Sequence, residues 1–204
     1  MLSVSSLSFS RGHRCLFADV NFTLQPGQWL HVEGGNGVGK TTLLRLICGL
    51  NALEQGEITW HNQSVAKDPD LFRAELAYLG HPLALKEDLT PVENILASAA
   101  VCGLHLSQGD AMAALTKMGL EGAAHLPVRV LSQGQKRRTA LARLVVSDAR
   151  LWILDEPFVA LDTPAQEVLC DVLNAHLNRQ GMLLLTSHQA VNLAGQGQTY
   201  RLSA

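Results

Sequence analysis

The chain has 204 residues with a net charge of −2 and a pI near 6.4, and 47% of its residues are hydrophobic. This length allows one large domain or two small ones with a substantial core. Because nucleic-acid-binding proteins usually carry a basic excess, the charge balance predicts no nucleic-acid partner. No apolar run reaches the roughly 18 residues needed to cross a bilayer, so we expect no membrane span.

The cysteines and the N-terminus point to a reducing compartment. The four cysteines are widely spaced and form no C-x-x-C pair, which disfavours a local disulfide or a zinc site. The N-terminal residues lack the charged start and the long apolar run of a secretion signal. We therefore expect reduced thiols in a cytosolic protein.

The first part of the chain predicts strands and one helix around a glycine loop. Alternating apolar residues in Leu2–Phe9 and Phe17–Leu24 predict short antiparallel strands at a sheet edge. A short apolar run, Trp29–Val32, then leads through glycines into a helix expected over Thr41–Leu50 and ended by Gly49. Two further strands are expected at Glu57–Trp60 and Leu76–Leu79.

The pattern becomes helical in the middle of the chain and returns to strands afterwards. The expected elements are helices over 92–101, over 109–118 and up to about 146, a strand at 151–154, a helix over 164–179 and a strand at 182–186. The last strand is wholly apolar, as in a parallel sheet covered on both faces. We predict one α/β cassette, with a mixed-sheet core at about 1–80 and 146–204, an antiparallel edge sheet and a helical subdomain at about 81–145.

A phosphate-binding loop follows the third expected strand. Its residues match the pattern G-x-x-x-x-G-K-[ST] in full and are Gly34, Gly35, Asn36, Gly37, Val38, Gly39, Lys40 and Thr41. Backbone N–H groups of such a loop and the following helix N-terminus bind phosphate oxygens. Lys40 should reach the β- and γ-phosphates of ATP, Thr41 should ligate Mg²⁺, and Thr42 should support the same phosphates.

Two acidic residues, Asp155 and Glu156, close the buried strand 151–154. The carboxyl ends of parallel strands lie at the ligand-binding edge of such sheets, so Asp155 should hold Mg²⁺ through water. Glu156 should point elsewhere, because side chains alternate along a strand.

These motifs, together with Leu131-Ser132-Gln133-Gly134-Gln135, identify the chain as a member of the ATP-binding-cassette (ABC) ATPases, a branch of the P-loop NTPases. Ser132 is expected to cap the helix that follows. The resemblance implies that Ser132, Gly134 and Gln135 bind the γ-phosphate held by a second copy, so that two cassettes form an ATP-sandwich dimer. It further implies that Glu156 polarises the attacking water and that His188 contacts the γ-phosphate.

Two positions depart from the usual cassette pattern. His81 stands where most members have a glutamine, and an imidazole has a shorter reach and a charge that changes with pH. Arg11 occupies the position of the aromatic residue that stacks on adenine, with Phe9 nearby. Because a guanidinium can lie flat on a base, we expect ATP to bind with weaker adenine discrimination.

The details look most like the ATP-binding subunit of the bacterial haem-export system for cytochrome c maturation. Gly80-His81, Leu151–Phe158 and His188-Gln189 carry this resemblance, as does the short chain beyond His188. It implies a polytopic membrane permease as partner and a peripheral position on the cytoplasmic face of the inner membrane. Another small exporter cassette, or an ABC ATPase of DNA repair or translation, remains an alternative; the short span between the phosphate loop and Ser132 disfavours the repair class.

Overall fold

The computed structural model describes residues 1–203 in two units. Unit 1 contains residues 1–80, 149–157 and the chain from Asn174 onward. Unit 2 contains residues 81–148 and 158–173. The sequence predicted that all of residues 146–204 belong to the core. The two units instead group residues 158–173 with the helical middle of the chain. The domain limits given in the sequence analysis therefore remain a prediction.

The first sheet of unit 1 is antiparallel and has four strands in the order β2-β1-β4-β5. The strands are β1 (Leu2–Arg11), β2 (Arg14–Leu24), β4 (Gln55–Trp60) and β5 (Gln63–Ser64). Apolar side chains alternate along β1 and β2 and bury one face, as the sequence pattern predicts. The β1–β2 hairpin ends where Arg11 pairs with Arg14.

The second sheet of unit 1 has five strands, and every pairing in it is parallel. In spatial order they are β6 (Leu76–Leu79), β7 (Leu151–Leu154), β8 (Met182–Thr186), β3 (Gln28–Glu33) and β9 (Gln196–Arg201). All residues of β7 and β8 are buried, as expected for central parallel strands. The carboxyl ends of these strands meet at one edge, where the site described below is built.

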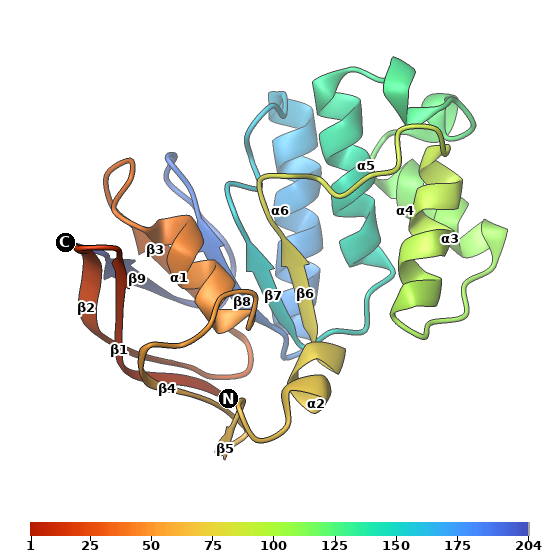
Figure 1. The fold of residues 1–204 in the computed structure, drawn as a ribbon. Coiled ribbons are helices and arrows are strands. Elements are labelled where there is room, and N and C mark those ends of the chain that lie inside the picture. The colour runs from red at the N-terminus through yellow and green to blue at the C-terminus, as the bar shows by residue number, and fades with distance from the viewer. Residues whose placement is uncertain (204) are drawn as a thin grey trace. The chain divides into compact units, whose positions relative to one another are not determined.

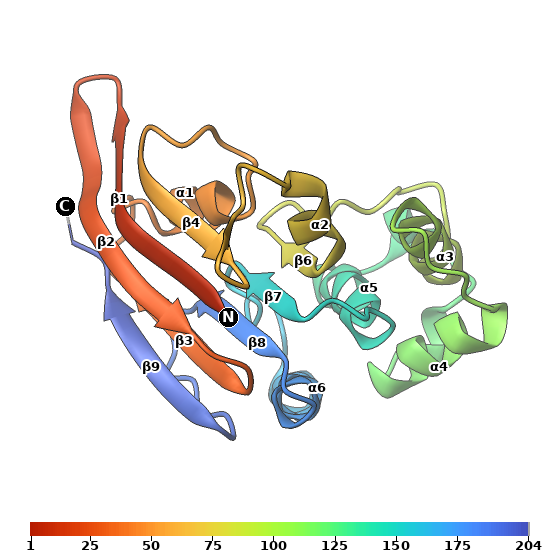
Figure 2. The same ribbon diagram turned by 90° about the horizontal axis from the view of Figure 1, so that it is seen from below.

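Helix α1 (Lys40–Ile47) lies between the two sheets of unit 1 (Figures 1 and 2). Its side chains Leu43, Leu44 and Ile47 are fully buried in a core shared by both sheets. The helix ends before Gly49, which adopts a φ of 68° and stops the chain from continuing as a helix. This packing fixes the helix N-terminus, and with it the phosphate loop, against the parallel sheet.

The opposite face of the parallel sheet is covered by the end of α6 (Thr163–Asn178). The His176 ring stacks on the Trp152 ring of β7, with centroids 3.8 Å apart and planes 10° apart. The backbone at Gly181 passes so close to the His176 ring that any side chain at this position would overlap the ring.

Unit 2 contains three helices that begin with a capping box: α3 (Pro91–Val101), α4 (Gln108–Lys117) and α5 (Gln133–Val145). The boxes pair Thr90 with Glu93, Ser107 with Asp110, and Ser132 with Gln135. In each box two helix-terminal N–H groups are satisfied by side chains, which fixes where the helix starts. Two single 3₁₀ turns, Glu121–Ala123 and Val128–Val130, connect α4 to α5.

The predicted α/β class, the antiparallel sheet and the main strands and helices are confirmed. Three elements were not predicted: α2 (Pro69–Ala74), β5 and β9. The sequence of β9 is polar and only partly buried, so no apolar alternation marks it. Among residues 1–203, no helix combines the length and the apolar character needed to cross a bilayer.

Candidate nucleotide site

A cavity of about 490 Å³ opens in unit 1 beside the phosphate loop. It is lined by Arg11, Arg14, Leu16, Gly35, Asn36, Gly37, Gly39, Lys40, Thr41, Thr42, Asp155, Glu156 and His188. The structure therefore brings together most of the residues that the sequence predicts for the site. His81, Ser132, Gly134 and Gln135 belong to unit 2 and are described within that unit.

The phosphate loop is held by close packing and by Lys40. Gly39 adopts a φ of 108°, and a Cβ there would lie 3.0 Å from the buried Phe17 ring. A side chain at this position would therefore be strained and crowded. Lys40 is 8% exposed, and its Nζ donates to the carbonyl oxygens of Gly34 at 2.7 Å and Gly35 at 3.4 Å. The ammonium thus lies over the loop whose N–H groups would face an anion.

Asp155 is buried between two hydroxyl groups from neighbouring elements. Its Oδ2 accepts a hydrogen bond of 2.7 Å from Thr41 Oγ1, and its Oδ1 accepts one of 2.7 Å from Thr186 Oγ1. Thr41 is in the first turn of α1 and Thr186 ends β8, so the carboxylate joins the loop helix to the sheet. Hydrogen bonds of this kind stabilise the ionised carboxylate.

Glu156 follows Asp155 in a left-handed backbone conformation with a φ of 50°. Its N–H donates to Thr186 Oγ1 at 2.9 Å. Its carboxylate faces His188: Oε2 accepts the His188 backbone N–H at 3.2 Å, and Oε1 lies 3.4 Å from His188 Nε2. Non-glycine residues seldom adopt such a φ, and when they do they often lie at functional sites.

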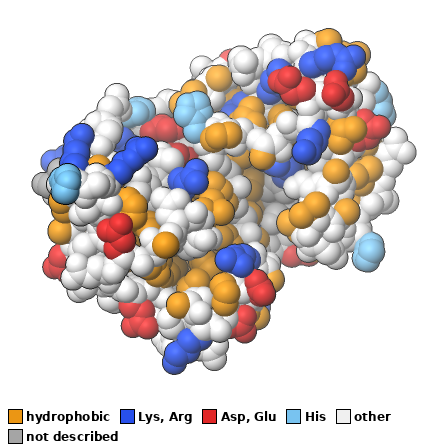
Figure 3. Space-filling model, in the orientation of Figure 1, with side chains coloured by type: hydrophobic (Ala, Val, Ile, Leu, Met, Phe, Trp, Pro, Cys, Tyr) orange, Lys and Arg blue, Asp and Glu red, His pale blue; other side chains and the backbone are white. Residues whose placement is uncertain are grey.

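The end of the β1–β2 hairpin gives the cavity a basic side. Arg11 and Arg14 both line it and are both exposed (Figure 3 shows Lys and Arg side chains gathered over this hairpin end). The lining includes no Phe, Tyr or Trp. Phe17 is fully buried and Phe9 packs on it, with ring centroids 6.3 Å apart, so both rings are used in the core.

The segment Leu131–Gln135 is ordered by its own hydrogen bonds within unit 2. Ser132 Oγ accepts the Gln135 N–H at 3.2 Å, and Gln135 Oε1 accepts the Ser132 N–H at 2.9 Å. The predicted N-cap role of Ser132 is confirmed. Gly134 approaches the Ala160 carbonyl so closely that a Cβ would lie 3.0 Å from the oxygen. A side chain at position 134 would therefore push on the loop that contains Ala160.

His81 is exposed at the start of unit 2. The loop after it is held by Arg143 of α5, which donates to the carbonyl oxygens of Leu83 at 2.7 Å and Ala84 at 3.3 Å. Burial lowers the pKa of Arg143 from its ordinary value.

Burial also keeps two groups of unit 1 neutral. Burial, together with the Asp155 carboxylate, raises the pKa of Tyr78 to about 12. Burial likewise raises the pKa of the Cys48 thiol. Neither group can supply a charge to the site at neutral pH.

Three lining or supporting residues were missed by sequence reasoning. Arg14 and Leu16 line the cavity, and Thr186 bonds to Asp155 and Glu156. Thr186 had a usable signal, because it is the only polar residue of the otherwise apolar strand Met182–Thr186. Arg14 could have been found from the hairpin, since it is the cross-strand partner of Arg11.

Comparisons with known proteins agree with this geometry. A family model described as ABC transporter matches residues 17–159. "Cytochrome c biogenesis ATP-binding export protein CcmA" of Dechloromonas aromatica is 50% identical over 203 residues, which cover 99% of this chain and 100% of that protein.

Two solved structures share the fold. A putative ABC transporter ATP-binding protein from Pyrococcus furiosus has a TM-score of 0.85 at 22% identity, over 97% of this chain and 96% of that one. A dimeric structure of a bacterial ABC transporter cassette has a TM-score of 0.82 at 22% identity, over 93% and 88%. The match to the family model and the 50% identity to the Dechloromonas aromatica protein show that the chain belongs to the ABC transporter family, among the cytochrome c biogenesis ATP-binding export proteins.

Proposed function

We propose that this chain is the ATP-hydrolysing subunit of a haem exporter for c-type cytochrome maturation, and that it energises release of the haem-loaded chaperone. The 50% identity to the Dechloromonas aromatica protein over nearly the whole of both chains carries this proposal. The cavity supports an ATPase in particular, because it places a phosphate loop, a buried aspartate and a glutamate around one space.

ATP would bind along the phosphate loop, with its phosphates against Lys40, Thr41 and Thr42. The Lys40 ammonium already lies over the loop carbonyls, so a phosphate entering there would gain a charge-assisted hydrogen bond. The adenine would lie toward the hairpin end, where Arg11 offers a flat guanidinium in place of an aromatic ring.

The oxygens of Thr41 and Asp155 fit a Mg²⁺ ion. Thr41 Oγ1 and Asp155 Oδ2 are 2.7 Å apart. The Thr41 oxygen can bind a hard cation while its hydroxyl proton is donated to the Asp155 carboxylate. Thr41 would bind directly and Asp155 through water, and the ion would neutralise charge on the phosphates. Thr186 would keep the Asp155 carboxylate in place.

Glu156 would accept a hydrogen bond from the attacking water, and His188 would contact the γ-phosphate. The support is that the Glu156 carboxylate and the His188 side chain line the same cavity and contact each other. His81 would serve in place of the usual glutamine, because an imidazole can also accept from water or donate to it.

A second copy of the chain would complete the site. Ser132, Gly134 and Gln135 begin α5 with a fixed helix N-terminus, which is a favourable place for a phosphate oxygen. Each copy would present this segment to the γ-phosphate bound by the other. The related cassette of known dimeric structure supports an ATP-sandwich dimer.

The membrane partner would be a polytopic permease, with the cassette bound peripherally at the cytoplasmic face of the bacterial inner membrane. The support is the relative's description as an export protein.

Complementation tests the proposed function. In a bacterial strain that lacks its own subunit of this kind, the native chain should restore haem attachment to c-type cytochromes, and Lys40→Ala should not. The native chain should also co-purify with the permease. Restored ATPase activity in membranes without any c-type cytochrome would contradict the haem-export assignment and favour a cassette for another exporter.

A further inference from the structure

A buried histidine outside the cavity contacts the segment that precedes His188. His31 is on β3 and is 5% exposed. Its Nε2 lies 3.1 Å from the carbonyl oxygen of Ser187, and its Nδ1 lies 3.5 Å from Glu33 Oε1. His31 is not among the residues that line the cavity, so it is separate from the residues expected to hold the nucleotide.

The strand register explains why His31 reaches this carbonyl. β3 and β8 are parallel neighbours, with His31 opposite Leu185 and Val32 opposite Thr186. Ser187 is the first residue after β8, and His188 follows it. The end of β8 is therefore held on both sides: Thr186 bonds to Asp155 on the β7 side, and the Ser187 carbonyl meets His31 on the β3 side.

The chemistry of this contact fixes its direction. A carbonyl oxygen only accepts, so Nε2 must carry the proton and donate it. Ser187 is 7% exposed. Leaving its buried carbonyl oxygen without a donor would cost more free energy than the net contribution of one hydrogen bond to stability.

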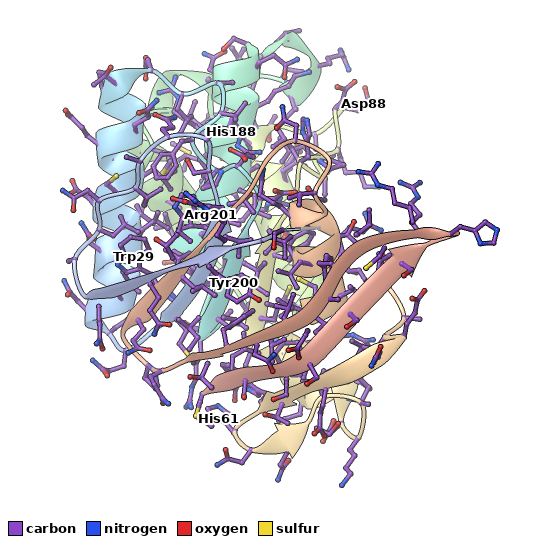
Figure 4. The ribbon with its side chains drawn as sticks, turned by 90° about the vertical axis from the view of Figure 1, so that its left-hand side faces the viewer. Trp29, His61, Asp88, His188, Tyr200 and Arg201 are labelled. Atoms are coloured by element: carbon purple, nitrogen blue, oxygen red, sulfur yellow. The ribbon has the colours of Figure 1, made fainter. Side chains whose placement is uncertain are left out.

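Glu33 lies beside the other ring nitrogen of His31, Nδ1. It is half-exposed and is the cross-strand partner of Arg201 on β9, whose Nη2 lies 3.8 Å from Glu33 Oε2. The Arg201 side chain is largely exposed, so this ion pair contributes little to stability. His188 follows β8 and Arg201 ends β9, and both are labelled in Figure 4. These two strands flank β3, one on each side.

We propose that His31 is a positioning residue for ATP hydrolysis: its Nε2–H holds the Ser187 carbonyl and thereby keeps His188 against Glu156. This inference rests on the roles proposed above for Glu156 and His188. His31 would act on turnover and leave nucleotide binding unchanged, because the residues expected to hold the phosphates belong to the loop and α1.

Three variants of the native chain test this role by steady-state phosphate release. His31→Leu removes the donor and should lower kcat by roughly three- to tenfold, the factor that corresponds to one lost hydrogen bond, with an unchanged KM for ATP. His31→Gln should restore most of kcat, because its amide nitrogen reaches as far as Nε2. His31→Asn is shorter and should resemble His31→Leu.

A matched control is His61→Gln, since His61 also faces a glutamate, with Nε2 3.3 Å from Glu75 Oε2, but contacts neither Ser187 nor the cavity. Its kcat should be native. Native kcat in His31→Leu, or equal kcat in the Gln and Asn variants, overturns the proposal; if His31→Leu does not fold, the Gln and Asn pair decides alone. Failure of the proposed function is recognised separately by the complementation test above, and failure of the role proposed for Glu156 by hydrolysis at the native rate in Glu156→Gln.

Discussion

The hydroxyl of Thr186 donates a hydrogen bond of 2.7 Å to Asp155 Oδ1. The same oxygen accepts the backbone N–H of Glu156 at 2.9 Å. One side chain at the end of β8 is therefore bonded to both acidic residues that follow β7. Because Glu156 is in the left-handed region, with a φ of 50°, this hydrogen bond stabilises a backbone conformation that the residue would otherwise avoid.

Thr186→Val should lower both stability and turnover. The variant keeps the shape of the side chain but leaves the Asp155 carboxylate and the Glu156 N–H without this partner. We expect the free energy of unfolding to fall by about 1–3 kcal/mol and kcat to fall roughly tenfold. Denaturant unfolding and phosphate release measure the two effects. Thr186→Ser keeps the hydroxyl and should retain most of both; an active, stable Thr186→Val chain would show that the link is dispensable.

Lys40→Ala should abolish tight ATP binding. Removing a charge-assisted contact to phosphate costs about 1.5–3 kcal/mol, which raises Kd by roughly 10- to 150-fold. Calorimetric titration with ATP measures the change. Lys67→Ala removes an exposed lysine that does not line the cavity, and it should bind ATP as the native chain does. Equal affinity in Lys40→Ala and the native chain would rule out the proposed role of Lys40.

Local sequence patterns predicted those parts of the fold that are determined by neighbouring residues. The apolar run 151–154 followed by two acids, and the glycine loop followed by α1, each carry a signal within about ten residues. Ser132 was also predicted as a helix cap, because its partner Gln135 lies three residues away.

Features that depend on distant residues could not be predicted in the same way. β9 is polar and becomes a strand because β3 offers it a parallel edge, with Trp29 packed over Gly197. The bond between Thr186 and Asp155 joins residues that are distant in sequence and meet only when β7 and β8 pair. The approach of His31 to Ser187 depends likewise on the pairing of β3 and β8.

His81→Gln should keep ATPase activity, because glutamine, the usual residue of the family at this position, provides both a donor and an acceptor. We expect kcat within roughly threefold of native, and a loss of at least about tenfold in His81→Leu, as for a residue that helps to place the attacking water. Phosphate release at saturating ATP compares the two variants. A fully active His81→Leu chain would mean that position 81 takes no part in hydrolysis.

His176 should make the fold sensitive to acid. Burial, together with the nearby Arg179 charge, lowers its pKa to about 4 from an ordinary value of 6.5, against the opposing effect of the hydrogen bond to Met182. Between these values the unfolded chain binds a proton that the folded chain does not, so the free energy of unfolding falls as pH is lowered from about 6.5 to about 4 and is unaffected above this window.

The contribution of His176 is isolated by comparison with His176→Phe, which keeps a ring against Trp152 but does not titrate. The native chain should lose on the order of 2 kcal/mol more than the variant across this window, measured by urea unfolding at a series of pH values. Parallel stability curves for the two chains would show that His176 does not cause the acid sensitivity.

The most direct measurement is phosphate release by Glu156→Gln together with its elution in size-exclusion chromatography in the presence of ATP and Mg²⁺. The amide cannot accept the proton of the attacking water, whereas the phosphate loop is unchanged. We predict that the variant binds ATP, releases phosphate at least about 100-fold more slowly than the native chain, and elutes as a stable dimer. Hydrolysis at the native rate by a monomeric variant would contradict the account of this chain as one half of an ABC ATPase.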